Sequence, residues 1–179
     1  MMASLLNIDT HRGVGVHLGF TLRVALVVVW PLLAIASCAA QEARTPTYEK
    51  LSLVGSDRVN HPIQVEVMRT PEQLWHGLRW RKHMDPDKGM LFDLGSVRMA
   101  VFTMSDTIIP LDMIFIGPDG RIVNIDAKTV PGNPGPYNSQ APVRAVLELN
   151  AGIAEKLKLG PGDMVRYDPL FANAAARAP

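Results

Sequence analysis

The sequence has one cysteine, few aromatic residues and almost no excess of charge. Its 179 residues include 18 lysines and arginines against 17 aspartates and glutamates, and 6% are aromatic. A single cysteine excludes an intramolecular disulfide framework and a multi-cysteine zinc site. The balanced charge lacks the basic character that nucleic-acid binding usually needs, so we expect no nucleic-acid partner. P-loop, dinucleotide-binding and serine-nucleophile motifs are also missing from the sequence.

Apolar residues make up 47% of the chain, which excludes an intrinsically disordered protein. They are concentrated near the N-terminus, where Arg12 and Arg23 precede the uncharged stretch 24–41. A basic region followed by about 7–15 apolar residues and then small residues is typical of a secretory signal. A membrane-spanning helix needs about 20 apolar residues, and Pro31 interrupts this shorter run. We therefore expect residues 1–37 to be a signal peptide and the protein to be exported to the periplasm.

The end of this leader predicts the point of membrane attachment. Ile35-Ala36-Ser37-Cys38 resembles a bacterial lipobox, in which an aliphatic residue and two small residues precede the cysteine that is lipidated. The alternative is an ordinary signal-peptidase site among the small residues before Gln41, which would release a soluble periplasmic protein. The only cysteine of the chain stands at the lipobox position. This coincidence favours a lipid anchor on Cys38.

The rest of the chain predicts one β-rich domain between two irregular segments. Residues 38–50 are polar and predict a tether, and the alanine-rich residues 172–179 predict a disordered tail. Residues 51–171 are enough for a single domain. Alternating or continuous apolar patterns predict seven short strands. They lie at 63–68, 90–94, 99–104, 111–116, 121–127, 145–149 and 164–167.

Two short helices complete the predicted domain. Thr70, Pro71 and Gln73 form a capping-box pattern that starts a helix extending to about Leu78. Asn150 is a candidate cap for a second helix over 151–159. Because strands and helices do not alternate regularly, we do not expect a doubly wound parallel sheet. We expect a mainly β fold of sandwich or jelly-roll type, or a closed barrel, mostly antiparallel, with two short peripheral helices.

Several separated motifs occur in the order typical of one family. They are Gly77-Leu78, Gly89-Met90-Leu91-Phe92, Met104-Ser105-Asp106-Thr107, Ile109-Pro110-Leu111-Asp112, Val146-Leu147-Glu148-Leu149 and Gly162-Asp163. Over residues 63–167 the chain resembles the domain of unknown function 192 family, small bacterial and archaeal proteins that are often exported. The resemblance implies a compact β-rich domain of sandwich or jelly-roll type and no established activity.

The chain also departs from the pattern of that family. Thr103 stands where the family usually has tryptophan, and Ser105-Asp106 stand where it usually has Lys-Asn. Arg79 follows the Gly-Leu motif in place of a hydrophobic residue. A ligand that relied on the usual residues would bind this chain differently or not at all.

The strongest candidate site residues are acidic residues inside apolar strands. Alternation places Asp112 on the same face of its strand as Ile114 and Ile116, and Glu148 also lies between apolar residues. A buried carboxylate needs partners or has a raised pKa. Asp112 and Glu148 either converge on a pocket, with Asp106 as a third member, or are structural, each satisfied by backbone amides or by an arginine such as Arg81.

Two further groups of residues are candidates for ligand binding. Met104, Asp106 and Thr107 belong to a polar segment after a strand, which predicts either a tight turn or a ligand-facing loop. Arg81 belongs to a basic cluster close to two tryptophans, which indicates either a site for an acidic ligand or a solvated loop. This cluster comprises Arg79, Arg81, Lys82 and Lys88, with Trp75 and Trp80 nearby.

Metal binding has weaker support in the sequence. The spacing of His61, His76 and His83 matches no helical ligand pair, which favours exposed loop histidines. Methionine thioethers could bind periplasmic copper, but most methionines lie in apolar strand-like segments, where they are expected to fill the core. These include Met90, Met99, Met104 and Met113.

The sequence thus predicts a periplasmic binding or accessory domain without a cofactor and without catalysis of its own. Its expected partner is an unidentified small molecule or envelope protein, and the membrane itself if Cys38 is lipidated. Two alternatives stay open: a small hydrolase or lyase that uses Asp112, Glu148 or Asp106 as acid and base, and a copper-binding envelope protein.

Overall fold

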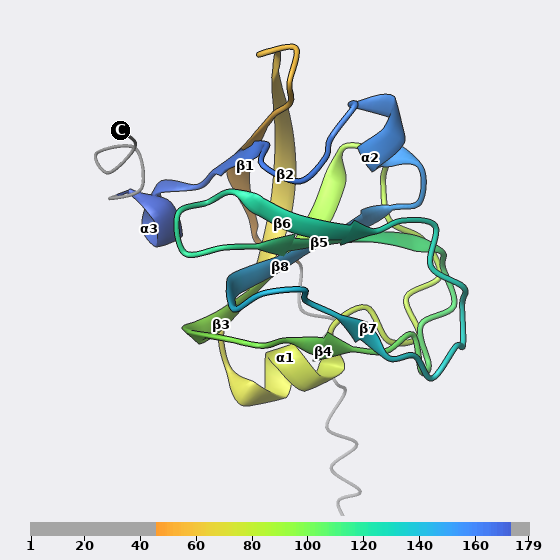
Figure 1. Ribbon diagram of the computed structural model, residues 1–179. Coiled ribbons are helices and arrows are strands. Elements are labelled where there is room, and N and C mark those ends of the chain that lie inside the picture. Colours follow the sequence, from red (N-terminus) through yellow and green to blue (C-terminus); the bar gives the residue numbers. More distant parts are fainter. Residues whose placement is uncertain (1–45, 173–179) are drawn as a thin grey trace, which may run out of the picture. The chain divides into compact units, whose positions relative to one another are not determined.

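The computed structural model describes residues 46–172, so the expected signal peptide, Cys38 and residues 173–179 lie outside the described residues. Within them, no helix is long and apolar enough to cross a membrane. Residues 46–172 form nine strands and three short helices (Figure 1). The strands are β1 (Tyr48–Val54), β2 (Asn60–Met68), β3 (Lys88–Arg98), β4 (Val101–Phe102), β5 (Leu111–Ile116), β6 (Ile122–Asp126), β7 (Tyr137–Asn138), β8 (Val143–Asn150) and β9 (Met164–Arg166), and the helices are α1 (Pro71–His76), α2 (Ile153–Lys156) and α3 (Asp168–Phe171).

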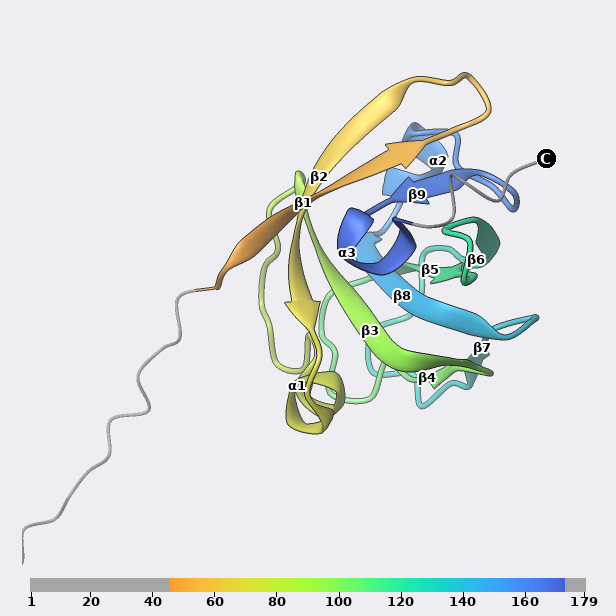
Figure 2. The ribbon, with the colours of Figure 1, turned by 90° about the vertical axis from the view of Figure 1, so that its left-hand side faces the viewer.

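Seven strands form one curled sheet in the order β6-β5-β8-β3-β2-β1-β9 (Figure 2). The β2–β3 pair is parallel, and the other pairs of this sheet are antiparallel. The two ends of the sheet meet, because Val165 N donates to Gly120 O and Ile122 N donates to Asp163 O, each at 2.8 Å. Strands β4 and β7 form a separate small sheet. The prediction of a mainly β, mostly antiparallel domain is confirmed.

Two neighbouring strands, β5 and β8, are apolar on both faces, so the sheet has a hydrophobic core on each side. All six residues of β5 are buried, and alternation divides them between the two cores. Ile114 and Ile116 join the inner core, inside the curl, with residues of β1, β2 and β9. Leu111, Met113 and Phe115 join the outer core, which also contains residues of β3, β8 and the 99–104 segment. This division of β5 between two faces is the one predicted from its sequence.

Helix α1 covers part of the outer core and has the expected start. Thr70 Oγ1 accepts a hydrogen bond from Gln73 N at 3.2 Å, and Gln73 Oε1 accepts one from Thr70 N at 3.0 Å. The predicted capping box is therefore confirmed. The helix ends at His76 rather than Leu78 because Gly77 has a φ of +49°. A Cβ at Gly77 would lie 3.1 Å from Phe92 Cζ, so glycine allows α1 to approach β3 closely.

Other segments differ from the sequence-based expectations. Strand β1 begins at Tyr48, so the boundary expected at residue 51 falls within this strand. Strand β7 lies in the proline-rich stretch 130–142, outside the seven strands predicted from the sequence. Helix α3 was not expected, and the strand predicted at 99–104 shortens to β4.

The expected cap of α2 is wrong. The Asn150 side chain does not cap the helix, because its Nδ2 donates to the carbonyl oxygens of Met84 and Asp85, at 2.9 and 3.1 Å. Gly152, in the left-handed region, precedes the helix without a side-chain cap. Asn150 therefore ties the end of β8 to the loop before β3.

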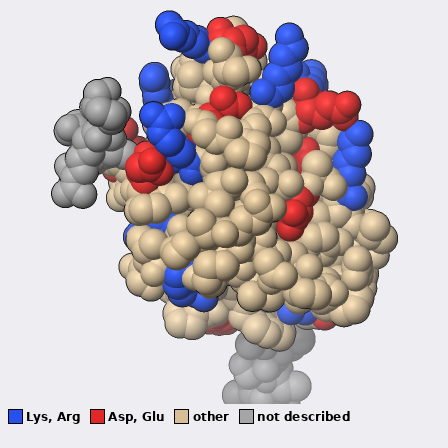
Figure 3. Space-filling model, viewed as in Figure 1, with Lys and Arg blue, Asp and Glu red and all other residues tan. Residues whose placement is uncertain are grey.

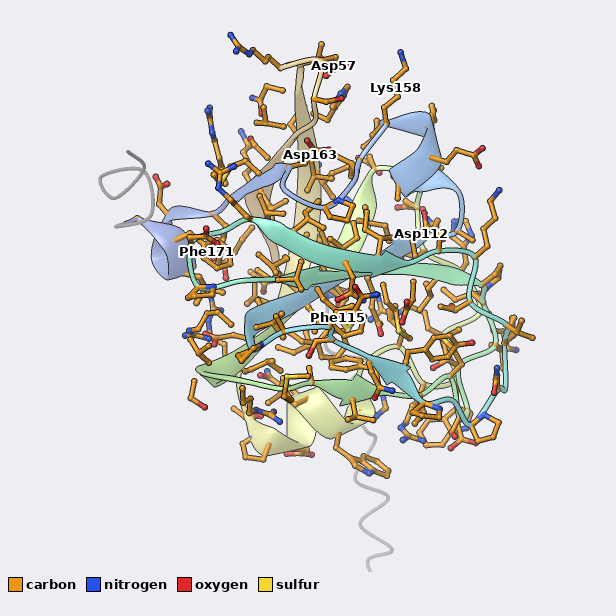
Figure 4. The ribbon with its side chains drawn as sticks, in the orientation of Figure 1. Asp57, Asp112, Phe115, Lys158, Asp163 and Phe171 are labelled. Atoms are coloured by element: carbon orange, nitrogen blue, oxygen red, sulfur yellow. The ribbon has the colours of Figure 1, made fainter. Side chains whose placement is uncertain are left out.

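Asp112 connects α2 and a neighbouring loop to the centre of the sheet. Its side chain is fully buried, on the side of β5 that faces α2, whereas Phe115 lies on the opposite side (Figure 4). One carboxylate oxygen accepts from Lys128 N and the other from Ala154 N, each at 2.8 Å. Both oxygens are thus satisfied by backbone amides, so the structural alternative for Asp112 is confirmed.

Replacing Asp112 with asparagine should destabilise the domain. In Asp112→Asn one acceptor becomes an NH₂ donor, which leaves either Lys128 N or Ala154 N buried without a partner. We expect the free energy of unfolding to fall by about 2 kcal/mol, measured by urea denaturation. Asp87→Asn, a change in an exposed loop, is the matched control. Equal unfolding midpoints for Asp112→Asn and Asp87→Asn would contradict the structural role.

Candidate functional site

A pocket of about 310 Å³ lies between α1, the second half of β3, β4 and the 103–107 segment. Its walls combine apolar and polar side chains in similar measure, and these come from separate parts of the sequence. The lining residues that matter here are Leu74, Trp75, Leu78, Arg79, Phe92, Leu94, Arg98, Phe102, Thr103, Ser105, Thr107 and Glu148. Small-molecule sites are usually concave and combine apolar walls with polar groups that fix the orientation of the ligand.

Glu148 is the one carboxyl group among the residues that line this pocket. It projects from β8 on the face of the outer core and is 4% exposed. Within residues 46–172, no group forms a hydrogen bond or an ion pair with its side chain, which distinguishes it from the other buried carboxylates. Desolvation raises its pKa from 4.5 to about 8. Glu148 is therefore mainly protonated at neutral pH.

A cluster of aromatic and basic side chains lies at the α1 side of the pocket. The Arg79 guanidinium stacks 4.8 Å from the centroid of the Trp75 ring, and its Nε donates to Trp75 O at 3.0 Å. Its Nη1 donates to Asp106 Oδ2 at 2.6 Å. Asp106 therefore neutralises Arg79. Trp75 and Val101 are exposed, in keeping with the largely uncharged surface over β4 and β7 in the lower part of Figure 3.

The 103–107 segment is a tight turn that also faces the pocket. Thr107 N donates to Met104 O at 2.9 Å, and Asp106 has a φ of +60°. The segment is thus the predicted tight turn, and two of its residues, Ser105 and Thr107, line the pocket. Thr107 is 6% exposed, and its hydroxyl forms no hydrogen bond with another described group. Met104 lies in the outer core, with its sulfur 3.3 Å from the Thr129 hydroxyl.

The structure does not bring Asp112 and Glu148 together. In the β5–β8 register, Asp112 is opposite Leu149, and Glu148 is opposite Met113. Because neighbouring residues of a strand point to opposite faces, the two carboxyl groups lie on opposite sides of the sheet. The hypothesis that they converge on one pocket is wrong.

Arg81, another candidate from the sequence, does not line the pocket. Its guanidinium forms two hydrogen bonds with the Glu66 carboxylate, one of them 2.9 Å between Nη2 and Oε2. The Glu66 side chain raises the pKa of Arg81, and Tyr48 OH also donates to Glu66 Oε1, at 3.3 Å. Arg81 thus stabilises the attachment of the loop after α1 to β2.

Metal-binding expectations find little geometric support in the described part of the chain. Residues 46–172 contain no group of three or more histidine, cysteine, aspartate or glutamate side chains suited to a metal ion. His76 and His83 are exposed, whereas His61 lies in β2 and is half-buried, so its expected loop position is wrong. Met90, Met104 and Met113 are buried in the outer core, as predicted, but Met99 is exposed.

Several pocket residues were not singled out from the sequence. Phe92 and Phe102 line the pocket, with ring centroids 5.1 Å apart in an edge-to-face arrangement. One feature of the sequence, its departures from the family pattern, points to the pocket. The departures from the family pattern at Arg79, Thr103 and Ser105 all lie in the pocket wall, although they are up to 26 positions apart.

Comparisons with known proteins agree with the resemblance noted in the sequence. The profile of the domain of unknown function 192 family, DUF192, described as an uncharacterized ACR, matches residues 53–167. A Sinorhizobium meliloti 1021 protein, described as a putative transcription regulator, is 39% identical with a TM-score of 0.66, over 68% of this chain and 95% of that chain. A protein of unknown function from Novosphingobium aromaticivorans DSM 12444 is 35% identical with a TM-score of 0.67, over 70% of this chain and 89% of that chain. The search of curated proteins gave no match.

The raised pKa of Glu148 predicts how stability depends on pH. Between about pH 4.5 and 8 the folded state keeps a proton that the unfolded chain has released. The free energy of unfolding should therefore fall as pH rises, by up to about 1.4 kcal/mol per pH unit from this group. Glu148→Gln removes this contribution, so the variant should gain stability relative to the native chain as pH rises through this window.

Urea denaturation at pH 5, 7 and 9 checks this prediction. Glu155→Gln is the matched control, since Glu155 is an exposed carboxylate on α2. If Glu148→Gln and the native chain show parallel pH profiles, Glu148 does not titrate as its burial requires.

Proposed function

We propose that this protein, which belongs to the domain of unknown function 192 family, is an exported domain that binds a small molecule in the pocket beside Glu148. The observation that carries the proposal is a single buried carboxyl group, without a partner in the described residues, in an aromatic pocket of about 310 Å³. A pocket of this kind supports recognition of an organic molecule with one polar end.

The arrangement of carboxylates favours binding over catalysis. A hydrolase that works with paired carboxylates needs both groups within about 5–10 Å across an open cleft. Here Asp112 is sealed by Lys128 N and Ala154 N, and Asp106 pairs with Arg79. Glu148 is left as the one carboxyl in the pocket lining. The geometry therefore supports a binding module better than an acid–base enzyme.

The N-terminal sequence supports the export part of this proposal. Residues 1–37 have the pattern of a signal peptide, and Cys38 follows a lipobox-like sequence. We place the domain at the periplasmic side of a membrane, attached through a lipid on Cys38. A binding domain held there would meet small molecules or other envelope proteins.

Capture of a bound molecule tests the binding proposal. The native protein, incubated with an envelope extract and washed, should retain a small molecule that native mass spectrometry detects. Thr103→Trp places an indole at an exposed position of the pocket wall and should reduce retention at least tenfold, because it occupies the space that the ligand needs. Asp87→Asn, remote from the pocket, should retain the molecule like the native protein. Retention that is absent in the native protein, or equal in Thr103→Trp, would overturn the proposal.

Cell fractionation tests the anchor. The full-length protein should be found with the membrane fraction, and Cys38→Ser should move to the soluble fraction because no thiol is left to acylate. Radiolabelled palmitate should be incorporated into the native protein only. A Cys38→Ser protein that stays in the membrane fraction would contradict the lipid anchor.

A further inference from the structure

Three glutamate and aspartate side chains of residues 46–172 are buried, and two of them are fully satisfied. Glu66 receives two hydrogen bonds from the Arg81 guanidinium. Asp112 receives one from each of two backbone amides. Glu148 has no such partner among the described residues. The Glu148 side chain lines the pocket, and among residues 46–172 the only fully enclosed side-chain nitrogen or oxygen without a partner is His61 Nε2. The Glu148 oxygens can therefore be reached from the pocket, so a molecule bound there can supply their partner.

The surroundings of Glu148 favour a positively charged partner. Arg79 lies in the same wall, but Asp106 already neutralises it, and Arg98 is exposed to solvent. His76 also lines the pocket from α1, at an exposed position. A cation next to Glu148 would stabilise the ionised carboxylate in a site shielded from water, where the attraction between opposite charges is strong. Because Glu148 is protonated when it has no charge partner, a bound cation would promote release of its proton and then pair with the carboxylate, whereas an anion or a neutral molecule would gain no such ion pair.

The remaining acceptors and walls fit a primary ammonium group on an apolar body. An ammonium has three N–H donors. Glu148 offers two oxygens and the buried Thr107 hydroxyl offers a third acceptor, all in the lining of one pocket. The rings of Phe92 and Phe102, together with leucines of α1 and β3, supply the apolar wall, and aromatic faces also attract cations.

We infer that the pocket binds a primary amine, whose ammonium group pairs with Glu148 and Thr107 and whose apolar body packs against Phe92 and Phe102. This inference rests on the proposed function and specifies its ligand class. It assigns Glu148 the role of charge partner and Thr107 the role of hydrogen-bond acceptor.

Three compounds of similar size and shape but different charge test the inference. Cyclohexylmethylamine is a cation at pH 7, cyclohexylmethanol is neutral, and cyclohexanecarboxylate is an anion. Isothermal titration of the full chain should show that the amine binds about 10-fold to 100-fold more tightly than the alcohol, the range expected for a hydrogen-bonded charge pair. The carboxylate should bind most weakly.

Variants then assign the selectivity to particular groups. Glu148→Gln should abolish the preference for the amine while the alcohol still binds, and Thr107→Val should reduce the preference by a smaller factor. Glu155→Gln removes an exposed carboxylate on α2 and should leave all three affinities unchanged.

The possible outcomes separate this inference from the proposed function. If the alcohol or the carboxylate binds as tightly as the amine, and Thr103→Trp weakens that binding, the pocket binds small molecules but the amine inference is overturned. If Glu155→Gln weakens amine binding as much as Glu148→Gln does, the effect comes from overall charge and the inference is also overturned.

If none of the three compounds binds while the native protein still retains a molecule from the extract, the amine inference fails alone. Failure of both experiments overturns the proposed function as well.

Discussion

The structure depends on two adjacent strands, β5 and β8, that are apolar on both faces. Such strands must be covered on both sides, because each exposed face would leave a row of large apolar side chains in water. The curl of the seven-stranded sheet covers one face with β1, β2 and β9. The outer face is covered by short pieces instead: α1, the β4–β7 pair and the loops between them. The pocket lies within this second, less regular cover.

The difference between the two covers explains why the two central carboxylates behave differently. Asp112 points to the α2 side, where the first turn of α2 and the Lys128 loop present backbone amides at 2.8 Å. Glu148 points to the outer face, where α1 ends at His76 and the 103–107 turn forms hydrogen bonds mainly with itself and the 130–133 loop. Among residues 46–172, no backbone amide donates a hydrogen bond to the Glu148 side chain, in contrast to the two that donate to Asp112. Its burial without a partner follows from the way the outer face is covered.

Local patterns in the sequence were enough to find most strands but not the residues that meet in the pocket. The division of β5 between two faces could be predicted, because it depends only on alternation. Whether Asp112 and Glu148 share a face depends on the register between β5 and β8, in which Asp112 is opposite Leu149. No local pattern specifies that register.

Strand β7 has two residues and exists only through its pairing with β4, so it had no periodicity from which it could be predicted. The pocket likewise joins α1 to a turn about 30 residues later in the chain.

The position of the family-like motifs within the pocket indicates how recognition is divided. Glu148 belongs to the motif Val146-Leu147-Glu148-Leu149, and Thr107 to Met104-Ser105-Asp106-Thr107, two segments through which the chain resembles its family. Arg79 and Thr103, at which it departs from the family pattern, lie in the wall of the same pocket. Under the proposed function, residues of the family pattern recognise the end of the ligand at Glu148, and Arg79 and Thr103 contact the part that is specific to this protein. A threonine in place of the bulky tryptophan also leaves more open space at that wall, so the ligand of this chain can extend further there than a ligand confined by an indole.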